Sequence, residues 1–176
     1  MSDQTKTKGE SSGRAVRPRW KRWLRDIVLL LLVFGAVQWW QARNLVKGPA
    51  PALVGHLSEG TPFQLDPTQG PYLVHFWASW CPICRLEEDS IASIADDRPV
   101  ITVATTSGSP QEVDAYLAAQ GVNMPVLMDE DGEIARNWGV NGVPATFVVN
   151  TDGDISHAGM GYSSEAGLRL RLWLAE

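Results

Sequence analysis

The sequence has 176 residues, of which 44% are apolar and 20% charged, and its net charge is −5. This length suits one compact domain with short appendages, and the composition is that of a globular protein rather than a disordered chain. The net charge conceals a division, because residues 1–26 carry a net +5 and the remaining residues carry −10. A basic arm could bind nucleic acid, but this one ends at an apolar run. We therefore interpret it as a membrane-topology signal and expect no nucleic-acid partner.

The apolar run covers residues 27–37 and is too short by itself to cross a bilayer, which needs roughly 20 residues. Extended to residues 23–42, it reaches that length, with Trp39 and Trp40 suited to the membrane interface. The sequence thus predicts a basic, disordered cytoplasmic tail at 1–22 and a single-pass signal anchor at 23–42. By the positive-inside rule, the rest of the chain is expected on the periplasmic side of the inner membrane.

A cleavable signal peptide is the alternative to an anchor, since the length of the apolar run fits one. Its cleavage site does not fit, because signal peptidase needs small residues at positions −3 and −1. Cleavage after Ala42 would place Trp40 at −3, and cleavage after Ala36 would place Phe34 there. We therefore favour the uncleaved anchor, a linker at 43–51 that contains two prolines, and a folded domain at 52–176.

The chain contains only two cysteines, Cys81 and Cys84, and both belong to one C-x-x-C motif. A small exported domain that relied on structural disulfides would contain at least four. A metal half-site is the other common use of this spacing, but it needs two more ligands. The three histidines, His56, His75 and His157, are scattered without ligand spacing. We expect no metal and interpret the cysteines as reactive thiols.

The first half of the domain alternates short apolar runs with helical patterns. Strands are expected at 53–57, 62–65 and 72–77, and the last is apolar enough to be buried on both faces. A helix should begin near the cysteines, with Leu86, Ile91 and Ile94 on its buried side. Another strand is expected at 100–104.

The second half begins with a helix from Ser109, whose Ser-x-x-Glu pattern predicts a capping box, to residue 120. A strand at 124–128 and a short helix at 132–138 should follow. Strands at 145–150 and 155–160 flank a turn, and a last helix is expected to be capped by Ser163 or Ser164. Strands that alternate with helices and end in a hairpin and a helix predict an α/β fold with a mixed central sheet.

Two segments resemble thioredoxins: FWASWCPIC at 76–84 resembles their active-site segment, and NGVPATFVV at 141–149 resembles their cis-proline loop and the strand after it. The segment DEDGEIAR at 129–136 is similar to the central insertion of the exported TlpA/ResA/DsbE branch. The resemblance covers 52–176 and implies a thioredoxin-like fold with helices flanking a mixed sheet. It also implies a thiol–disulfide oxidoreductase with a redox-active Cys81–Cys84 disulfide and no prosthetic group.

Thiol–disulfide exchange needs a thiolate that attacks a disulfide and a second thiol that resolves the mixed disulfide. We assign Cys81, at the expected helix start, as the nucleophile, because free N–H groups there stabilise a thiolate. Cys84 is assigned as the more buried resolving thiol. The expected partners are proteins with thiols or disulfides, and a membrane redox partner that recycles the motif.

The resemblance also implies that Val143 precedes a cis proline, Pro144, and that this loop faces the cysteines. In the family, the backbone before that proline pairs with the substrate chain. Trp80 and Pro82 are expected to form a substrate-binding rim beside Cys81.

His75 is a departure from the family pattern, since thioredoxins carry Asp six residues before the first cysteine and many TlpA-like proteins carry Asn. Its imidazole could relay the proton of Cys84, or it could be a core histidine without a catalytic role. A second departure is Ala145, where cytochrome-c-maturation members place Glu. Ala145 argues against a role in the haem pathway. The pair Pro82-Ile83 between the cysteines, His75 and the anchor together look more like the suppressor-of-copper-sensitivity D group.

The direction of electron flow depends on how well the Cys81 thiolate is stabilised. Ile83 cannot donate a hydrogen bond to it, and the acidic residues that follow Cys84 disfavour it, whereas Arg85 opposes them. The balance indicates a reductase, with a thiol oxidase or isomerase as the alternative. Two other classes are less consistent with the sequence: a thiol peroxidase, which uses one cysteine in a different loop, and a non-catalytic membrane scaffold.

Overall fold

The computed structural model describes residues 19–42 and 44–176, and it divides the chain into two compact units that meet between Ala36 and Val37. The expected tail at 1–18 lies outside the described residues. The expected anchor falls within one helix, α1 (Arg19–Ala42), whose apolar side chains at 27–33 are exposed. Among the helices of the described residues, none combines the length and the apolar character needed to cross a membrane.

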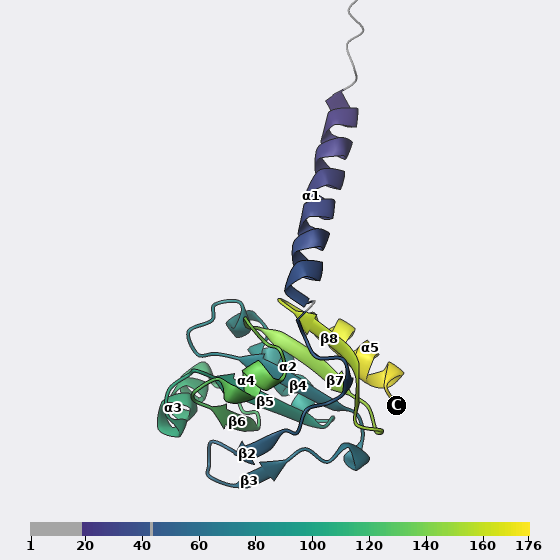
Figure 1. Ribbon diagram of the computed structural model, residues 1–176. Helices are drawn as coiled ribbons and strands as arrows, with labels where there is room; N and C mark the ends of the chain where they lie inside the picture. The colour runs from purple at the N-terminus through teal and green to yellow at the C-terminus, as the bar shows by residue number, and fades with distance from the viewer. Residues whose placement is uncertain (1–18, 43) are drawn as a thin grey trace, which may run out of the picture. The chain divides into compact units, whose positions relative to one another are not determined.

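The folded domain is built on a six-stranded mixed sheet, with strand order β1-β8-β7-β4-β5-β6 (Figure 1). Strands β4, β5 and β6 are parallel, whereas β7, β8 and β1 are added antiparallel. The strands are β1 (Gly48–Pro49), β4 (Tyr72–Trp77), β5 (Val100–Thr105), β6 (Val126–Asp129), β7 (Ala145–Val149) and β8 (Asp154–Met160). The mixed sheet confirms the predicted fold class.

A separate hairpin of β2 (Val54–His56) and β3 (Pro62–Gln64) lies beside the free edge of the sheet (Figure 1). It reaches that edge through an antiparallel bridge between Leu57 and Leu127, a residue of β6. A short 3-10 helix, η1 (Pro67–Gln69), connects the hairpin to β4. Both strands of the hairpin lie at the positions expected from the sequence.

The sheet is buried on both faces, as expected for the apolar run that forms β4. Alternate residues of that strand point to opposite sides, so Leu73 and Trp77 join one core cluster and Val74 and Phe76 join the other. The first cluster contains both cysteines and side chains of α2 (Glu88–Ala95), α3 (Pro110–Gln120) and α5 (Glu165–Leu174). The second contains residues of α4 (Glu133–Asn137) and of the chain before β2.

Helix α3 follows the sequence prediction closely. Ser109 forms the capping box with Glu112, and Gly121 ends the helix in the left-handed conformation with φ of 71°. That conformation is strained for residues with a side chain, which is why glycine commonly follows helices. Ser164, the second of the two expected caps, begins α5.

The helix after the cysteines differs from the prediction. It begins as a 3-10 helix, η2 (Cys84–Leu86), and α2 starts only at Glu88. A 3-10 helix has three residues per turn rather than 3.6, so the phase of its side chains shifts relative to an uninterrupted α-helix. Leu86 is 70% exposed instead of buried, whereas Ile91 and Ile94 pack in the core as expected. Even in an uninterrupted α-helix, five residues turn through about 500°, so Leu86 points about 140° away from Ile91.

The segment 44–51, which we expected to be part of a linker, packs against the domain. Leu45 is buried, the N–H of Val46 donates to the carbonyl of Trp138, and Gly48 and Pro49 form β1 against β8. Pro can occupy such a strand because β1 lies at the edge, where one side of the backbone needs no partner. The domain therefore begins before residue 52, and the described part of the linker forms its edge.

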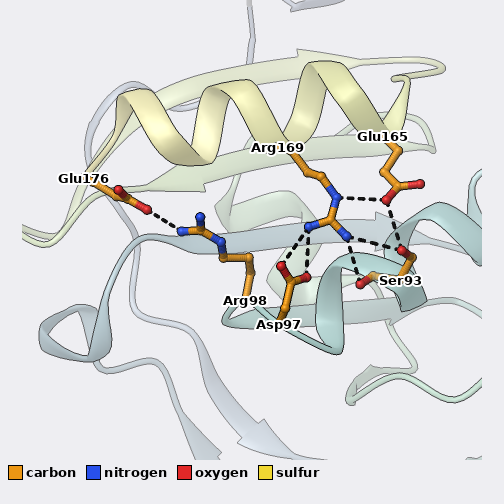
Figure 2. A network of polar contacts seen from close by, with 6 residues as sticks. All are labelled: Ser93, Asp97, Arg98, Glu165, Arg169 and Glu176. Atoms are coloured by element: carbon orange, nitrogen blue, oxygen red, sulfur yellow. Dashed lines mark hydrogen bonds and ion pairs between the residues drawn. The ribbon is translucent and has the colours of Figure 1, made fainter.

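Helices α2 and α5 are joined by one arginine (Figure 2). Arg169 of α5 donates to Asp97, to Glu165 one turn earlier, and to both the carbonyl and the hydroxyl of Ser93. Arg98 pairs with Glu176 at the end of the chain. These contacts hold α5 against α2, the helix that follows the cysteines.

Candidate functional site

Cys81 and Cys84 form a disulfide with a Cα–Cα distance of 5.3 Å. Strand β4 ends at Trp77, and a short loop brings Cys81 to the start of η2. The N–H of Cys84 lies 3.2 Å from Sγ of Cys81. One backbone donor therefore points at the sulfur that we expected to be nucleophilic. Because α2 begins only at Glu88, the stabilising groups at this sulfur belong to the short helical turn and not to an α-helix start.

The loop before the disulfide is tied to the end of β5. The N–H of Ser79 donates to Oγ of Ser107 at 3.1 Å, and Nε1 of Trp80 donates to the carbonyl of Thr106 at 3.1 Å. Thr106 has a φ of 45°, unusual for a β-branched residue. These bonds hold Trp80 in a fixed orientation, although its side chain is 63% exposed.

The second expected segment lies against the disulfide. The Val143–Pro144 peptide bond is cis, and the carbonyl oxygen of Val143 lies 3.7 Å from Sγ of Cys81. The N–H of Gly161 donates to the carbonyl of Pro144 at 2.8 Å. The structure thus brings Cys81, Val143 and Pro144 together from segments 62 residues apart.

The surface around the disulfide is apolar, while the sulfurs are almost covered. Cys81 is 3% exposed and Cys84 1%. Trp80, Pro82, Ile83 and Leu86 are exposed beside them in the sequence. Trp80 and Pro82 are therefore exposed on either side of Cys81. A substrate has to pass over these side chains to reach the sulfur of Cys81.

His75 lies in β4 on the same face of the sheet as Leu73 and Trp77, the face that carries the disulfide. Its Nδ1 is 3.0 Å from Oγ1 of Thr146 on β7. Complete burial lowers the pKa of His75 to about 4. The ring is therefore neutral at neutral pH, and it is a weaker base than an exposed histidine.

Glu87 is one of the acidic residues after Cys84 that we expected to disfavour the Cys81 thiolate, but the sequence analysis did not predict its burial. It is fully buried, its Oε1 accepts a hydrogen bond from the N–H of Ser163, and its Oε2 has no partner among the described residues. Burial raises its pKa to about 7, against a smaller opposing effect of the Ser163 bond. Its spacing from Cys84, three residues in a helical turn, was the available signal, since such residues share one face.

The other charged residues near the disulfide are arranged differently from the sequence expectation. Glu88 is buried and accepts a hydrogen bond from the hydroxyl of Tyr116, while Asp89 is exposed. Arg85 lies over the ring of Tyr116, 5.9 Å from its centroid, and Nε donates to its hydroxyl. We expected Arg85 to stabilise the Cys81 thiolate against the nearby acids, but its guanidinium group interacts with Tyr116 instead.

Within the described part of the chain, no cluster of three or more His, Cys, Asp or Glu side chains could hold a metal ion.

Comparison with known proteins assigns the family. The redoxin family model matches residues 45–169, which is most of the chain. The chain is a redoxin. A "thioredoxin-like protein" of Haemophilus influenzae is 33% identical over 121 residues, 67% of this chain and 72% of the relative. The thiol:disulfide interchange protein DsbE of Escherichia coli is 28% identical over 171 residues, 87% of this redoxin and 89% of the relative.

A solved structure of a thiol:disulfide interchange protein from Chlorobium tepidum matches with a TM-score of 0.64 and 27% identity. The match covers 74% of this redoxin and 97% of that chain. The resemblance to thioredoxin-like oxidoreductases is thus confirmed, and this redoxin is a protein-disulfide oxidoreductase of the DsbE type with its C-x-x-C motif at Cys81 and Cys84.

Proposed function

We propose that this redoxin is an extracytoplasmic protein-disulfide reductase held at the inner membrane by α1. The observation that carries the exchange chemistry is the Cys81–Cys84 disulfide, whose Cys81 sulfur adjoins the carbonyl of Val143. In the reduced protein the Cys81 thiolate attacks a substrate disulfide, forming one S–S bond to Cys81 and releasing one substrate thiolate, which takes up a proton. The Cys84 thiol, on losing its proton, attacks Cys81 and releases the second substrate thiolate. Two electrons pass to the substrate.

Regeneration requires two electrons from a dithiol of a partner protein, which becomes oxidised to a disulfide in the same two steps. We assign that role to a membrane redox partner. The backbone of Val143, next to Pro144, binds the extended substrate chain, and Trp80 and Pro82 form the rim against which it lies. His75 enters this proposal as a neutral proton relay for Cys84, a role that its low pKa limits to transient protonation.

The direction is supported by the poor stabilisation of a Cys81 thiolate. One backbone N–H points at its sulfur, Ile83 supplies no side-chain donor, and Arg85 is engaged by Tyr116. A thiolate that is poorly stabilised makes the disulfide the more stable state and the dithiol the better reductant. Equilibration with glutathione should give a potential closer to about −270 mV, as in thioredoxin, than to about −120 mV, as in DsbA. A potential near about −120 mV would refute the proposal that this redoxin is a reductase.

Membrane attachment is supported by the apolar run within α1 and by the division of charge around it. At 1.5 Å per residue, the 24 residues of α1 extend over roughly 36 Å, compared with a hydrocarbon core of about 30 Å. Because α1 as a whole is less apolar than typical spans, the proposal depends on the run at 27–37. Full-length protein should stay in the membrane pellet after carbonate washing, with its C-terminal domain accessible to protease in spheroplasts. A mature N-terminus between residues 36 and 43 would exclude the anchor.

A further inference from the structure

The segment 44–50, which we call the strap, is bonded to two distant parts of the domain. Near its start, the N–H of Val46 donates to the carbonyl of Trp138 at 3.3 Å. Towards its end, β1 pairs with β8, and the N–H of Ala50 donates to the carbonyl of Gly153 at 2.9 Å. The strap is therefore fixed at both ends, and its first half lies against the residues that follow α4.

One side chain of the strap is part of the core. Leu45 is 4% exposed and belongs to the core cluster that contains Trp138 and Val140. Trp138 is fully buried, and the N–H of Val140 donates to the carbonyl of Ala135 at 2.8 Å. Protein cores are close-packed, so the position of one buried side chain constrains the positions of the others. Leu45 therefore helps to fix the chain where α4 ends.

Gly139 and the strap approach each other backbone to backbone. A Cβ atom on Gly139 would lie 2.1 Å from the carbonyl oxygen of Asn44 and 3.3 Å from Cα of Leu45. The φ of Gly139 is 70°, a value that also favours glycine. Because the obstructing atoms are backbone and not the end of a flexible side chain, a larger residue at 139 would displace the strap.

The residues held by the strap lead directly into the loop that faces the disulfide. Three positions after Val140, the carbonyl of Val143 lies 3.7 Å from Sγ of Cys81. Val143 packs against both core clusters. Beyond Pro144 the chain enters β7, which is paired on both sides. The far end of the loop is thus fixed by the sheet, and its near end by residues 138–140 and the strap.

We propose that the strap positions the Val143–Pro144 loop for substrate binding, with Leu45 and Gly139 as positioning residues. This inference rests on the proposed function, in which the backbone of Val143 pairs with the substrate chain. Backbone hydrogen bonds have donor–acceptor distances of about 2.7–3.2 Å, so a loop displaced by about 1 Å binds that chain poorly. Attack by Cys81 on a disulfide without a peptide chain needs no such pairing and should depend little on the strap.

The test uses the reduced full-length protein in detergent micelles, mixed with an excess of a disulfide-bonded peptide or of bis(2-hydroxyethyl) disulfide, which has no peptide backbone. Acid quenching and alkylation of the remaining protein thiols give a limiting rate and a half-saturating concentration for each variant. Gly139→Ala should raise the half-saturating concentration of the peptide by about tenfold. Its limiting rate, and its reaction with the small disulfide, should change by less than about threefold.

Gly121→Ala is the matched control for backbone strain. The φ of Gly121 is 71°, nearly that of Gly139, but nothing lies within 4 Å of the Cβ atom that the substitution adds. Both variants therefore strain the backbone alike, and only Gly139→Ala displaces the strap. Gly121→Ala should leave the half-saturating concentration of the peptide within about twofold of the wild-type value.

A second pair of variants tests the side chain of the strap. Leu45→Ala should raise the half-saturating concentration of the peptide severalfold, and Leu45→Met, which roughly conserves volume, should restore it. Leu53→Ala is the control, because Leu53 is 2% exposed in the same cluster but its carbonyl is bonded to Leu65. Should Leu45→Ala fail to fold by circular dichroism, Leu45→Val and Leu53→Val give the same comparison with a smaller expected change.

Two results would overturn the role of the strap and leave the proposed function intact. One is an equal half-saturating concentration of the peptide in each strap variant and its control. The other is a loss of reactivity that is as large with the small disulfide as with the peptide. A wild-type protein that reduces neither disulfide would instead refute the proposed function.

Discussion

The backbone N–H of Ser163 donates a hydrogen bond to Oε1 of Glu87, which lies 2.5 Å away and 76 residues earlier in the chain. Two residues before Ser163, the N–H of Gly161 donates to the carbonyl of Pro144. The segment 161–163 thus connects the buried acid after Cys84 with the loop that faces Cys81. Ionisation of Glu87 can therefore affect the stability of the domain and the position of the Pro144 loop.

Replacing Glu87 with Gln should change how stability depends on pH. Burial raises the pKa of Glu87 from 4.5 to about 7. The unfolded chain therefore releases this proton near pH 4.5, whereas the folded chain holds it until about pH 7. Over that window the unfolded state binds fewer protons, so the free energy of unfolding falls as pH rises and stays lower above pH 7. Urea denaturation at several pH values should show that the free energy of unfolding falls between pH 4.5 and 7 in the wild type but not in Glu87→Gln.

The same variant keeps an oxygen that can accept from Ser163, so its loss of stability at pH 4.5 should be small. Glu112→Gln, on the exposed start of α3, is the control, because hydrogen bonds from Ser109 lower the pKa of Glu112 and so give no fall in stability as pH rises. If the free energies of unfolding of wild type and Glu87→Gln changed in parallel between pH 4.5 and 7, Glu87 would not have a raised pKa in the folded protein.

His75→Asn should have the opposite effect on the pH profile. Burial lowers the pKa of His75 from 6.5 to about 4, so the unfolded state binds more protons between these values. Stability from this residue is complete above pH 6.5 and is lost as pH falls toward 4. In His75→Asn this loss of stability at low pH should be absent. Between pH 4.5 and 6.5 the free energy of unfolding of the variant should then fall as pH rises, because the effect of Glu87 remains.

The catalytic role of His75 has a separate readout. If the ring relays the proton of Cys84, then His75→Asn should slow the resolution of a preformed mixed disulfide severalfold at pH 6 to 7. The difference should fade by about pH 9, where the thiol ionises without help. Unchanged resolution across this range, measured by stopped-flow tryptophan fluorescence, would identify His75 as a core residue.

Cys84→Ser should accumulate mixed disulfides with substrate proteins, because attack by Cys81 proceeds and release does not. Cys81→Ser should accumulate few or none, since Cys84 is the more deeply covered sulfur. Non-reducing gels after acid quenching measure both, with the double serine variant as control. If the two single variants trapped similar amounts of substrate, Cys81 could not be assigned as the nucleophile and Cys84 as the resolving thiol.

Arg169→Ala should lower the midpoint of thermal unfolding, because it removes the bonds to Asp97, Glu165 and Ser93 together (Figure 2). Arg171→Ala on the same helix is the control for lost charge and helix propensity. Thermal unfolding at low and high salt measures the difference between the two variants. An equal effect of both would show that the contacts in Figure 2 contribute little.

Much of the local structure could be predicted from the sequence, because its determinants are short-range. The run at 72–77 is apolar on both sides, and it forms β4 at those residues. Ser109, Glu112 and Gly121 define α3 through caps that involve only neighbouring residues. The identity of the reacting pair followed similarly, because Cys81 and Cys84 are the only cysteines and share one motif.

What the tertiary structure decided depends on contacts between distant segments. Helical spacing places Glu87 on the same side as Cys84, but only the packing of that side against the chain near Ser163 shows that a carboxyl group is buried there. The order of strands and the pairing of β1 with β8 arise from packing that no local signal encodes. Trp80, Ala135 and Val143 line one small pocket although they come from three separate segments of the chain. The sequence by itself determined which atoms exchange electrons, whereas the folded chain decided what surrounds them, because burial and shape are properties of the whole packing.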